Sequence, residues 1–327
     1  MEIMVLRENE IQTVLTLDKV VELVETVFRE KGLKRVQMPP KTYLYFSKYQ
    51  GDLRTMPAYI ESLDIAGVKI VNVHPLNPSL HSLPTIMATI LIFDPRTGKP
   101  QCIMNGTWIT GARTGAAAAV ATKYLARRDS ENVGIIGAGF IARFHIEAFS
   151  KVFNMQKVYI YDIVKSKANK LAKEISEKID VKVYVAEAPK DVVENVDVLA
   201  TLTPARGPIV RNEWVHEGLH INAMGADAPG KQELDPLILK RAKIVVDDIE
   251  QASHSGEINV PLAQGIISLH DIYAELGEIV AGIKKGRETD KEITVFDSTG
   301  LAIQDVITAH YAYTEALKRG LGEKLYL

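Results

Sequence analysis

A glycine-rich stretch between an apolar run and an amphipathic run has the residue types of a phosphate-binding turn. In "VGIIGAGFIA", Gly137, Gly139 and Ala142 form the pattern G-x-G-x-x-A. Gly137 permits a tight turn, Gly139 lets the backbone approach a pyrophosphate, and Ala142 lets the following helix pack closely on the strand. The N-terminus of that helix would face the phosphates. The pattern therefore predicts a dinucleotide site.

An acidic residue follows the glycine turn at the spacing that dinucleotide sites use. "VYIYD" ends on Asp162, 23 residues after Gly139. A carboxylate at this place suits the ribose 2′-hydroxyl of NAD and repels the 2′-phosphate of NADP. We expect NAD(H) as the cofactor, with NADP(H) as the alternative. The other interpretation of the same residues is a plain α/β turn followed by a surface aspartate.

A lysine interrupts an apolar, β-branched run in "AGVKIVNVHP". Val68, Ile70, Val71 and Val73 surround Lys69 and indicate a buried strand. An unpaired ammonium in such a place costs several kcal/mol or loses its proton. Either Lys69 reaches water from a sheet edge, or it has a chemical role on a face that opens toward a ligand. Val71 and Val73 share the face of Lys69, and we expect this face to line a substrate pocket.

The elements around these residues fall into two patterns. Short strand-like runs separated by turns, from "KTYLYF" to "QCIMNG", indicate an antiparallel sheet, and "LDKVVELVETVFREKG" has helical spacing that stops at Gly32. After "RTGAAAAVATKYLARR", an alanine-rich helix that we expect Arg113 to open, apolar strands alternate with helices, which predicts a parallel sheet covered on both faces. The fold class is therefore α/β: a Rossmann doubly wound parallel sheet over residues 113–304, plus an α+β substrate-binding and dimerisation domain over 1–112 and 305–327.

Composition limits the partners that we consider. The chain has 327 residues, 24% of them charged, with a net charge of −2 and no basic block, so nucleic acid is not expected. Cys102 is the single cysteine, which excludes an intrachain disulfide and fits a reducing cytoplasm. We find no secretory signal and no apolar run long enough for a membrane span. No pair of histidines has metal-ligand spacing on one helix, and His74, His81 and His254 are interpreted as loop residues, so no metal site is expected.

Several longer motifs together resemble one known family. "GDLRTMPAY", "GVKIVNVHPLNPSLHSLPTIMA", "ARTGAAAAVATKYLA", "GIIGAGFIARFHIEA", "HINAMGADAPGKQELD" and "ITVFDSTGLAIQD" occur in the order seen in the ornithine cyclodeaminase/μ-crystallin family. Within it, the chain most resembles archaeal alanine dehydrogenases and Δ1-pyrroline-2-carboxylate (cyclic ketimine) reductases. The resemblance implies a homodimer, a nicotinamide cofactor, and hydride transfer at the α-carbon of a small amino or imino acid.

The resemblance also implies roles for individual residues. By position, it places Lys69 and Asp227 as the catalytic residues, with Lys69 and Thr299 at the substrate; Arg54 and Lys41, which are chosen for their charge and not by the resemblance, are the other expected substrate contacts. The cofactor contacts are Thr85, Arg113, Gly137, Ala138, Gly139, Phe140, Ile141, Asp162, Thr203, Met224, Gly225, Ala226, Lys231 and Ser298.

One departure from the family pattern bears on the substrate. Ornithine cyclodeaminases place a glutamate just before a "MP" pair, where this chain has Arg54 in "LRTMP". A cation there would repel the side-chain amine of ornithine and attract a carboxylate. We therefore expect a small or cyclic substrate with one carboxylate.

Reduction of an α-imino acid needs groups that hold the carboxylate and manage a proton on nitrogen. Arg54 can bind both carboxylate oxygens, and Lys41 can add a second cation. Lys69 can bind a carboxylate or act as an acid or base, since burial near other cations lowers its pKa. Asp227, after a Rossmann strand, can stabilise an iminium ion. Arg113 at a helix N-terminus can bind pyrophosphate.

Each of these residues also has a simpler interpretation. Asp227 can be a turn residue, the two arginines can form surface ion pairs, and Lys231 can pair with Asp227 or Glu233.

Three functions remain open on this sequence. The leading one is an NAD(P)H-dependent oxidoreductase that reduces Δ1-pyrroline-2-carboxylate to L-proline. The alternative is alanine dehydrogenase chemistry on pyruvate and ammonia. The further alternatives are an ornithine cyclodeaminase, which Arg54 disfavours, and a non-catalytic NAD(P)H-binding protein of the μ-crystallin kind.

Overall fold

The computed structural model describes residues 1–326, which divide into two compact units. The first unit comprises Met1–Arg113 together with residues 301–326, and the second comprises Thr114–Gly300. The first boundary falls inside helix α4 (Thr107–Leu125). This helix begins six residues before Arg113, so the expectation that Arg113 opens the alanine-rich helix is wrong. Its N-terminus follows Gly106 instead, whose carbonyl accepts hydrogen bonds from the backbone and the hydroxyl of Thr110.

An eight-stranded sheet forms the centre of the first unit. All of its neighbouring strands are antiparallel except β1 and β7, so the antiparallel sheet expected from the sequence is confirmed. The strand order is β18 (Glu323–Tyr326), β1 (Glu2–Leu6), β7 (Pro100–Asn105), β6 (Ile86–Phe93), β5 (Ile65–Val73), β4 (Gly51–Ile60) and β2 (Val36–Gln37), with β3 (Thr42–Phe46) also paired to β4.

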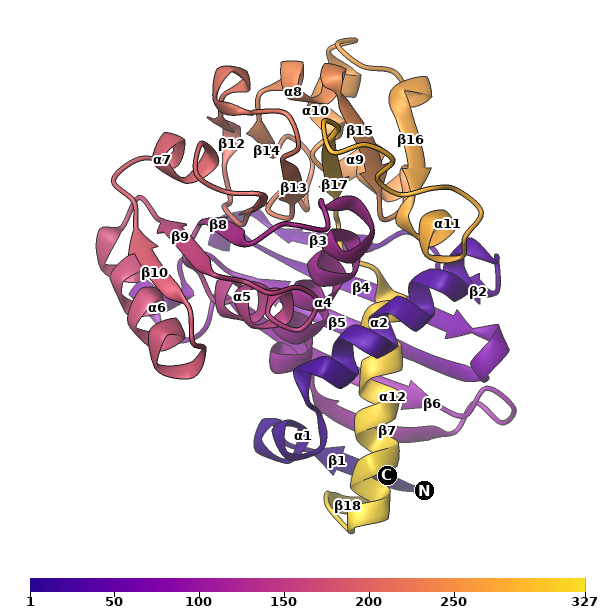
Figure 1. Ribbon diagram of the computed structural model, residues 1–327. Coiled ribbons are helices and arrows are strands. Elements are labelled where there is room, and N and C mark those ends of the chain that lie inside the picture. The colour runs from indigo at the N-terminus through magenta and orange to yellow at the C-terminus, as the bar shows by residue number, and fades with distance from the viewer. Residues whose placement is uncertain (327) are drawn as a thin grey trace. The chain divides into compact units, whose positions relative to one another are not determined.

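The last helix of the chain, α12 (Ala302–Arg319), packs against β4, β5 and β6 and also against helix α2 (Leu17–Gly32) (Figure 1). Helix α2 starts where the hydroxyl of Thr16 accepts a hydrogen bond from the backbone of Lys19, which is a standard N-cap. Helix α12 ends at Gly320, whose φ of 65° is left-handed. The remaining helical segments of this unit are α1 (Glu8–Val14), η1 (Ser47–Tyr49), η2 (Glu61–Leu63) and α3 (Asn77–Leu80).

The second unit contains eight parallel strands in one sheet. The order of the strands reverses between β8 and β11, which is where ligands bind in open α/β sheets. The Rossmann prediction is confirmed. The order is β10 (Lys182–Val185), β9 (Lys157–Tyr161), β8 (Asn132–Ile136), β11 (Val198–Thr201), β13 (His220–Ala223), β17 (Ile293–Asp297), β15 (Ala242–Val246) and β16 (Ile272–Glu275).

Two short strands, β12 (Arg206–Val210) and β14 (Gln232–Leu234), form a separate small parallel sheet that the sequence did not predict. Both begin shortly after loops at the carboxyl end of the main sheet. The helical segments of this unit, besides most of α4, are α5 (Ala142–Phe149), α6 (Lys165–Lys178), α7 (Pro189–Val193), η3 (Asn212–Trp214), α8 (Pro236–Arg241), α9 (Ile249–Ser255), α10 (Asn259–Ala263), η4 (Leu269–Asp271) and α11 (Leu276–Val280).

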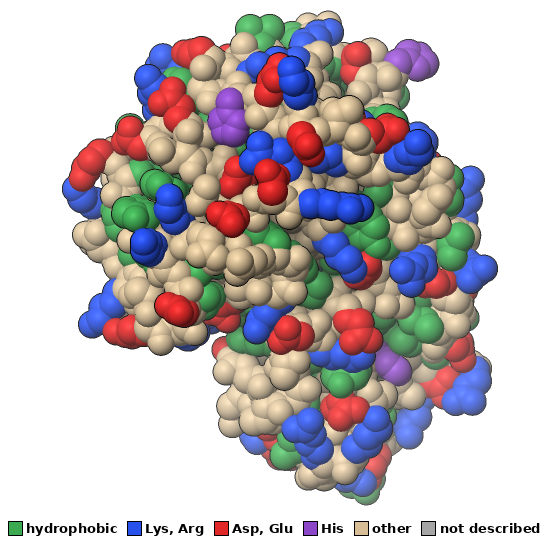
Figure 2. Space-filling view, in the orientation of Figure 1, with side chains coloured by type: hydrophobic (Ala, Val, Ile, Leu, Met, Phe, Trp, Pro, Cys, Tyr) green, Lys and Arg blue, Asp and Glu red, His purple; other side chains and the backbone are tan. Residues whose placement is uncertain are grey.

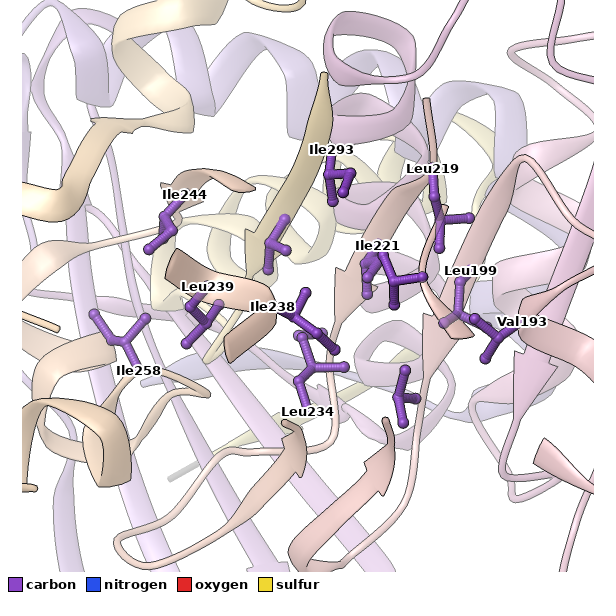
Figure 3. Packing of buried hydrophobic residues seen from close by; sticks show 14 of the residues in the cluster. Val193, Leu199, Leu219, Ile221, Leu234, Ile238, Leu239, Ile244, Ile258 and Ile293 are labelled. Carbon is purple, nitrogen blue, oxygen red and sulfur yellow. The ribbon is translucent and has the colours of Figure 1, made fainter. Parts of the chain in front are cut away.

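The core of the second unit packs the main sheet against the helices on one of its faces. Figure 3 shows Leu199 and Ile221 from neighbouring strands close to Val193 of α7, with Ile238 and Leu239 of α8 in the same cluster. All five side chains are at least 98% buried. This close packing fixes the positions of the strand ends, and so it also fixes where the following loops begin.

The surface carries mixed charge. Figure 2 shows basic and acidic side chains interspersed over the face in view, in keeping with the net charge of −2. Among residues 1–326, no helix combines the length and apolar character that crossing a membrane requires.

Candidate active site

Lys69 lies in the middle of the first unit's sheet. Its strand, β5, pairs with β4 on one side and β6 on the other, so Lys69 stands opposite Met56 and Ile90. The residue is only 1% exposed. The alternative that Lys69 reaches water from a sheet edge is therefore wrong, since β5 is an inner strand and the ammonium is buried.

A carboxylate on α12 meets this ammonium. Lys69 Nζ lies 2.8 Å from Oδ2 of Asp305, and Nε of Arg113 donates a 2.9 Å hydrogen bond to Oδ1 of the same carboxylate. Arg113 also donates from Nη1 to Oε1 of Gln304, at 3.1 Å. Asp305 is fully buried and Arg113 is 6% exposed. Arg113 is thus part of a buried cluster, and its interpretation as a surface ion pair is wrong.

The surroundings of Lys69 change its acidity. Burial, and next the positive charge of Arg113, lower its pKa from 10.5 to about 7, with a smaller contribution from Lys41 in the same direction. Asp305 acts in the opposite direction and limits the fall. A lysine with a pKa near 7 can hold or release a proton at neutral pH, as a general acid or base must. The sequence predicts the same fall in pKa, because burial near other cations disfavours the charged amine.

Arg54 is a second buried cation of the first unit. It lies on β4, 5% exposed, opposite Val71 of β5 and on the same face of the sheet as Lys69. Its Nε donates to Oδ1 of Asp52 at 2.7 Å and its Nη2 to Oδ2 at 3.1 Å, while the guanidinium lies over the ring of Tyr43. Burial rules out the interpretation as a surface ion pair, and the bidentate contact shows the geometry with which this guanidinium holds a carboxylate.

Lys41 and Thr85 are the other residues of the first unit singled out by the sequence. Lys41 precedes β3, is half-buried, and is near enough to Lys69 for its charge to lower the pKa of that residue. Thr85 precedes β6, and its carbonyl accepts a hydrogen bond from the backbone of His74. Lys41 therefore joins the cation cluster around Lys69.

The glycine turn of the second unit follows β8 at the point where the strand order reverses. Gly137 has a φ of 104°, and its N–H donates to the carbonyl of Tyr161. The backbone of Ala138 donates to Oδ2 of Asp162 at 2.8 Å, which ties the turn to the end of β9. A Cβ on Gly139 would meet no atom within 4 Å. The space beside Gly139 is thus open, as a turn that accommodates a pyrophosphate requires.

Phe140 and Ile141 complete this turn. Phe140 is 41% exposed and Ile141 is half-buried at the N-cap of α5. The guanidinium of Arg143 stacks on both Phe140 and Phe144, at 5.5 and 4.6 Å from the ring centres. The rings and the guanidinium brace the first turn of the helix.

One buried glutamate joins two loops at the carboxyl end of the sheet. Oε1 of Glu233 accepts hydrogen bonds from the N–H and the hydroxyl of Thr203, both at 2.7 Å, and Oε2 accepts from the N–H of Gly225 at 3.0 Å. Thr203 follows β11, and Gly225 follows β13. Met224 and Ala226 are buried, and Gly225 between them is half-buried.

A second buried glutamate supports the first. Glu257 accepts the backbone N–H groups of Glu233 and Leu234 at 2.7–3.0 Å. Burial, and next the charge of Glu233, raise the pKa of Glu257 well above its ordinary value, and burial also raises the pKa of Glu233. Glu257 thus fixes the backbone of β14, and the side chain of Glu233 in turn accepts the N–H groups of the two loops.

Asp227 lies in the turn after β13 and pairs with a neighbouring lysine. Nζ of Lys231 is 2.5 Å from Oδ1 of Asp227 and 3.5 Å from the carbonyl of Gly225. Of the two partners considered for Lys231, Asp227 is the one found. Asp227 is half-buried at the carboxyl end of the sheet, where a carboxylate can face a bound ligand.

Ser298 and Thr299 follow β17 and are held by one acid. The carboxylate of Asp247, fully buried at the end of β15, accepts from the hydroxyl of Ser298 at 3.1 Å and from the backbone N–H of Thr299 at 2.7 Å and of Gly300 at 2.8 Å. The loop after β17 is therefore fixed from the end of the neighbouring strand.

Sequence reasoning missed three carboxylates that organise these residues: Asp305, Glu233 and Asp247. Asp305 lies within the quoted motif "ITVFDSTGLAIQD". Its position on the apolar face of a predicted helix could have indicated its role, because a buried carboxylate requires a partner. Within residues 1–326, no group of three or more histidine, cysteine, aspartate or glutamate side chains has an arrangement that could hold a metal ion.

Comparison with known proteins agrees with this architecture. The chain is 48% identical to an alanine dehydrogenase of Archaeoglobus fulgidus, over 99% of this chain and 98% of the relative. It superposes with a TM-score of 0.95 on an archaeal alanine dehydrogenase dimer with bound NAD, at 48% identity and over the whole of both chains.

A second solved structure is similarly close. The Δ1-pyrroline-2-carboxylate reductase of Thermococcus litoralis, in complex with NADH and L-proline, gives a TM-score of 0.96 at 41% identity, over 98% of this chain and 99% of the other. The sequence profile of the ornithine cyclodeaminase/mu-crystallin family matches residues 1–320. A match over nearly the whole chain, together with the buried lysine and the Rossmann turn, shows that the protein belongs to the ornithine cyclodeaminase/mu-crystallin family.

Proposed function

We propose that this protein is an NAD(H)-dependent oxidoreductase that reduces Δ1-pyrroline-2-carboxylate, a cyclic ketimine, to L-proline. The observation that carries the proposal is the buried Lys69, which Asp305 holds at 2.8 Å and whose pKa is lowered to about 7. A proton must reach the imine nitrogen when hydride reaches the α-carbon, and such a lysine can supply it near neutral pH. The similar reductase solved with NADH and L-proline, the product of this reaction, supports the proposal.

The proposed roles of the first unit follow from its cations. Arg54 holds the substrate carboxylate, while Asp52 fixes the direction of its guanidinium through Nε and Nη2. Lys41 adds positive charge, and Lys69 orients the substrate and gives the proton. In the second unit, Asp227 stabilises the iminium cation and Thr299 lies next to the substrate. Bound NADH supplies the hydride.

The cofactor would be held mainly by the second unit. The open space beside Gly139 accepts the pyrophosphate, and Asp162 accepts hydrogen bonds from the ribose. The carboxylate of Asp162 favours NADH over NADPH. The remaining proposed contacts are Thr203, Met224, Gly225, Ala226, Lys231 and Ser298, with Gly137, Ala138, Phe140 and Ile141 of the turn, and Thr85 and Arg113 from the first unit.

Alanine dehydrogenase activity is the second candidate. The 48% identity to an alanine dehydrogenase over nearly the whole chain favours it. Pyruvate and ammonia lose water to form an open-chain imine, and its reduction at the α-carbon uses the same groups. The two candidates differ in the size and shape of the imine, so the choice depends on which substrate the pocket accommodates.

A substrate panel tests the proposal. Purified protein is incubated with NADH and either Δ1-pyrroline-2-carboxylate or pyruvate plus ammonia, and separately with NAD and ornithine. Loss of the NADH absorbance with formation of L-proline confirms the first candidate, and formation of L-alanine favours the second. No NADH oxidation with either substrate contradicts both, and L-proline from ornithine without net NADH use identifies a cyclodeaminase.

The negative control for this panel is the Lys69→Met variant. Lys170→Ala, which removes an exposed lysine of α6, controls for the loss of a lysine outside the proposed site. Turnover that survives in K69M would show that the absorbance change does not depend on the proposed site.

We also propose that the protein works as a homodimer in the cytoplasm. The similar archaeal alanine dehydrogenase is a dimer, and residues 1–112 with 305–327 form the proposed substrate-binding and dimerisation domain, with 113–304 as the cofactor domain. The single cysteine, Cys102, is buried and forms no disulfide, which suits a reducing compartment. Sedimentation equilibrium gives the mass in solution; a monomer at micromolar concentration would contradict the dimer.

A further inference from the structure

Helix α12 carries a carboxylate on the face that it buries. Asp305 is fully buried between Gln304 and Val306, which are buried as well. Helix α12 lies against β4, β5 and β6 of the first unit (Figure 1). A lone carboxylate in such a position would be strongly destabilising. Its presence therefore requires partners, and the partners are residues of the proposed active site.

The carboxylate of Asp305 divides its two oxygens between two cations. Oδ2 lies 2.8 Å from Nζ of Lys69, and Oδ1 accepts the Nε–H of Arg113 at 2.9 Å. Gln304, the preceding residue, accepts from Nη1 of Arg113 at 3.1 Å. One turn of α12 thus fixes the direction of both cationic side chains, from strand β5 and from helix α4.

The balance of charge around Lys69 depends on this single acid. Lys41 and Arg113 both favour the neutral amine, while Asp305 favours the ammonium. On the strand next to β5, the cation Arg54 is paired with Asp52. Opposite Lys69 on β6 stands the apolar Ile90. Without Asp305, two buried cations would face each other with no anion between them.

We propose that Asp305 is a positioning residue for the proposed reaction, which holds Lys69 and Arg113 on the two oxygens of one carboxylate and keeps the ammonium form of Lys69 accessible near neutral pH. The inference deepens the proposed function and rests on it for its chemical meaning. Asp305 itself is fully buried, so it acts through Lys69 and Arg113.

The first experiment needs no activity. The free energy of unfolding is measured by urea between pH 5 and pH 10 for wild type, Lys69→Met, Asp305→Asn and the double variant K69M/D305N. The wild-type minus K69M difference isolates the titration of Lys69 and should begin to rise near pH 7. The D305N minus K69M/D305N difference should begin to rise at least about one pH unit lower, because the anion that favours the ammonium is gone.

Thr308→Val is the matched control. Thr308 is buried one turn further along α12, and its hydroxyl donates to the carbonyl of Gln304 within the same helix. This variant disturbs the buried face of α12 without changing its charge. The pH at which its stability difference from the matching K69M/T308V variant begins to rise should therefore stay near 7. An onset in D305N equal to that of wild type would overturn the proposal.

Unfolding of D305N is itself informative. If D305N fails to fold but K69M/D305N folds, the carboxylate is needed to compensate the charge of Lys69, as proposed. If both fail to fold while K69M alone folds, the carboxylate is needed for Arg113 or for packing and not for the charge of Lys69, and the proposed control of Lys69 is wrong.

The second experiment uses the pH profile of kcat/KM with the substrate that the panel identifies. In D305N, the limb that depends on Lys69 should move to lower pH by at least about one unit, whereas T308V should keep the wild-type profile. An inactive wild type would refute the proposed function and leave the stability experiment to decide on Asp305. An active wild type with an unmoved limb in D305N would refute the role of Asp305 alone.

Discussion

Nζ of Lys69 and Oδ2 of Asp305 lie 2.8 Å apart in the interior of the first unit, although the two residues come from opposite ends of the chain. Both side chains are at least 99% buried. The pair places an amine in a packed sheet without leaving its charge uncompensated. It also explains why an apolar inner strand can contain a lysine.

The first prediction concerns turnover. Lys69→Met removes the amine and keeps the length and apolar stem of the side chain. We expect kcat to fall by at least about 100-fold, the scale of a lost general acid, while the Kd for NADH changes less than threefold, because the glycine turn and Asp162 lie in the other unit. Steady-state kinetics and NADH fluorescence titration measure both quantities. Unchanged kcat would reduce Lys69 to a structural residue.

The second prediction is a stability that rises with pH. The pKa of Lys69 is lowered to about 7 in the folded protein, against 10.5 for an ordinary lysine. Between these values the unfolded chain binds a proton that the native protein does not, so the free energy of unfolding rises with pH by up to about 1.4 kcal/mol per unit. Urea unfolding at several pH values should show this rise in wild type and not in K69M. Parallel curves for the two proteins would argue against a lowered pKa.

The third prediction separates the two glycines of the turn. A Cβ on Gly137 would lie 2.9 Å from the carbonyl oxygen of Leu202, at a φ of 104°, so Gly137→Ala should destabilise the second unit by more than about 1 kcal/mol. A Cβ on Gly139 would meet no protein atom. Gly139→Ala should therefore leave the melting temperature unchanged and weaken NADH binding at least about tenfold, a loss of about 1.4 kcal/mol. Equal NADH affinity in G139A and wild type would show that the open space is not the pyrophosphate site.

The fourth prediction concerns the choice of nicotinamide. Asp162 accepts the backbone N–H groups of Ala138 and Val164, both at 2.8 Å. Asp162→Ser keeps an acceptor for the local turn and removes the charge that repels a 2′-phosphate. The ratio of kcat/KM for NADH to that for NADPH should fall by about tenfold or more. If wild type already prefers NADPH, the argument from Asp162 fails.

The sequence predicted the local elements better than it predicted the partners of the buried charges. Helix α2 was expected over "LDKVVELVETVFREKG" and occupies Leu17–Gly32, because its apolar spacing and its N-cap at Thr16 are local features. Helix α4, which contains Arg113, starts earlier than expected. Its first residues, Thr107 to Ala112, are helical although their sequence shows no strong helical periodicity. Asp305 was missed because its partners, Lys69 and Arg113, come from distant parts of the chain. Pairing of that kind depends on how α12 packs against the sheet, which periodicity does not specify.

The short strands β12 and β14 were missed for a related reason. Gln232 and Glu233 in β14 are polar and fully or nearly fully buried, which strand patterns do not anticipate. Glu233 is buried because its carboxylate accepts three hydrogen bonds from Thr203 and Gly225. The buried Glu233 of β14 therefore binds the loops at the end of the main sheet.

The fifth prediction follows from these hydrogen bonds. In Glu233→Gln, the amide keeps one acceptor oxygen and turns its NH2 toward an N–H donor of Thr203 or Gly225. One loop then loses its acceptor, at a cost of about 1–3 kcal/mol. Because both loops belong to the proposed cofactor site, the Kd for NADH should rise about tenfold or more. Glu250→Gln, an exposed position on α9, is the control and should bind NADH as wild type does.

Measurements of NADH affinity and of the melting temperature, with and without saturating NADH, test this expectation. NADH stabilises only the folded protein, so its upward shift of the melting temperature should be smaller in E233Q than in wild type at the same NADH concentration. A lower melting temperature with an unchanged NADH shift would mean that Glu233 supports the fold but does not position the cofactor loops. A smaller shift in E233Q, with E250Q unchanged, would place the loops after β11 and β13 at the cofactor.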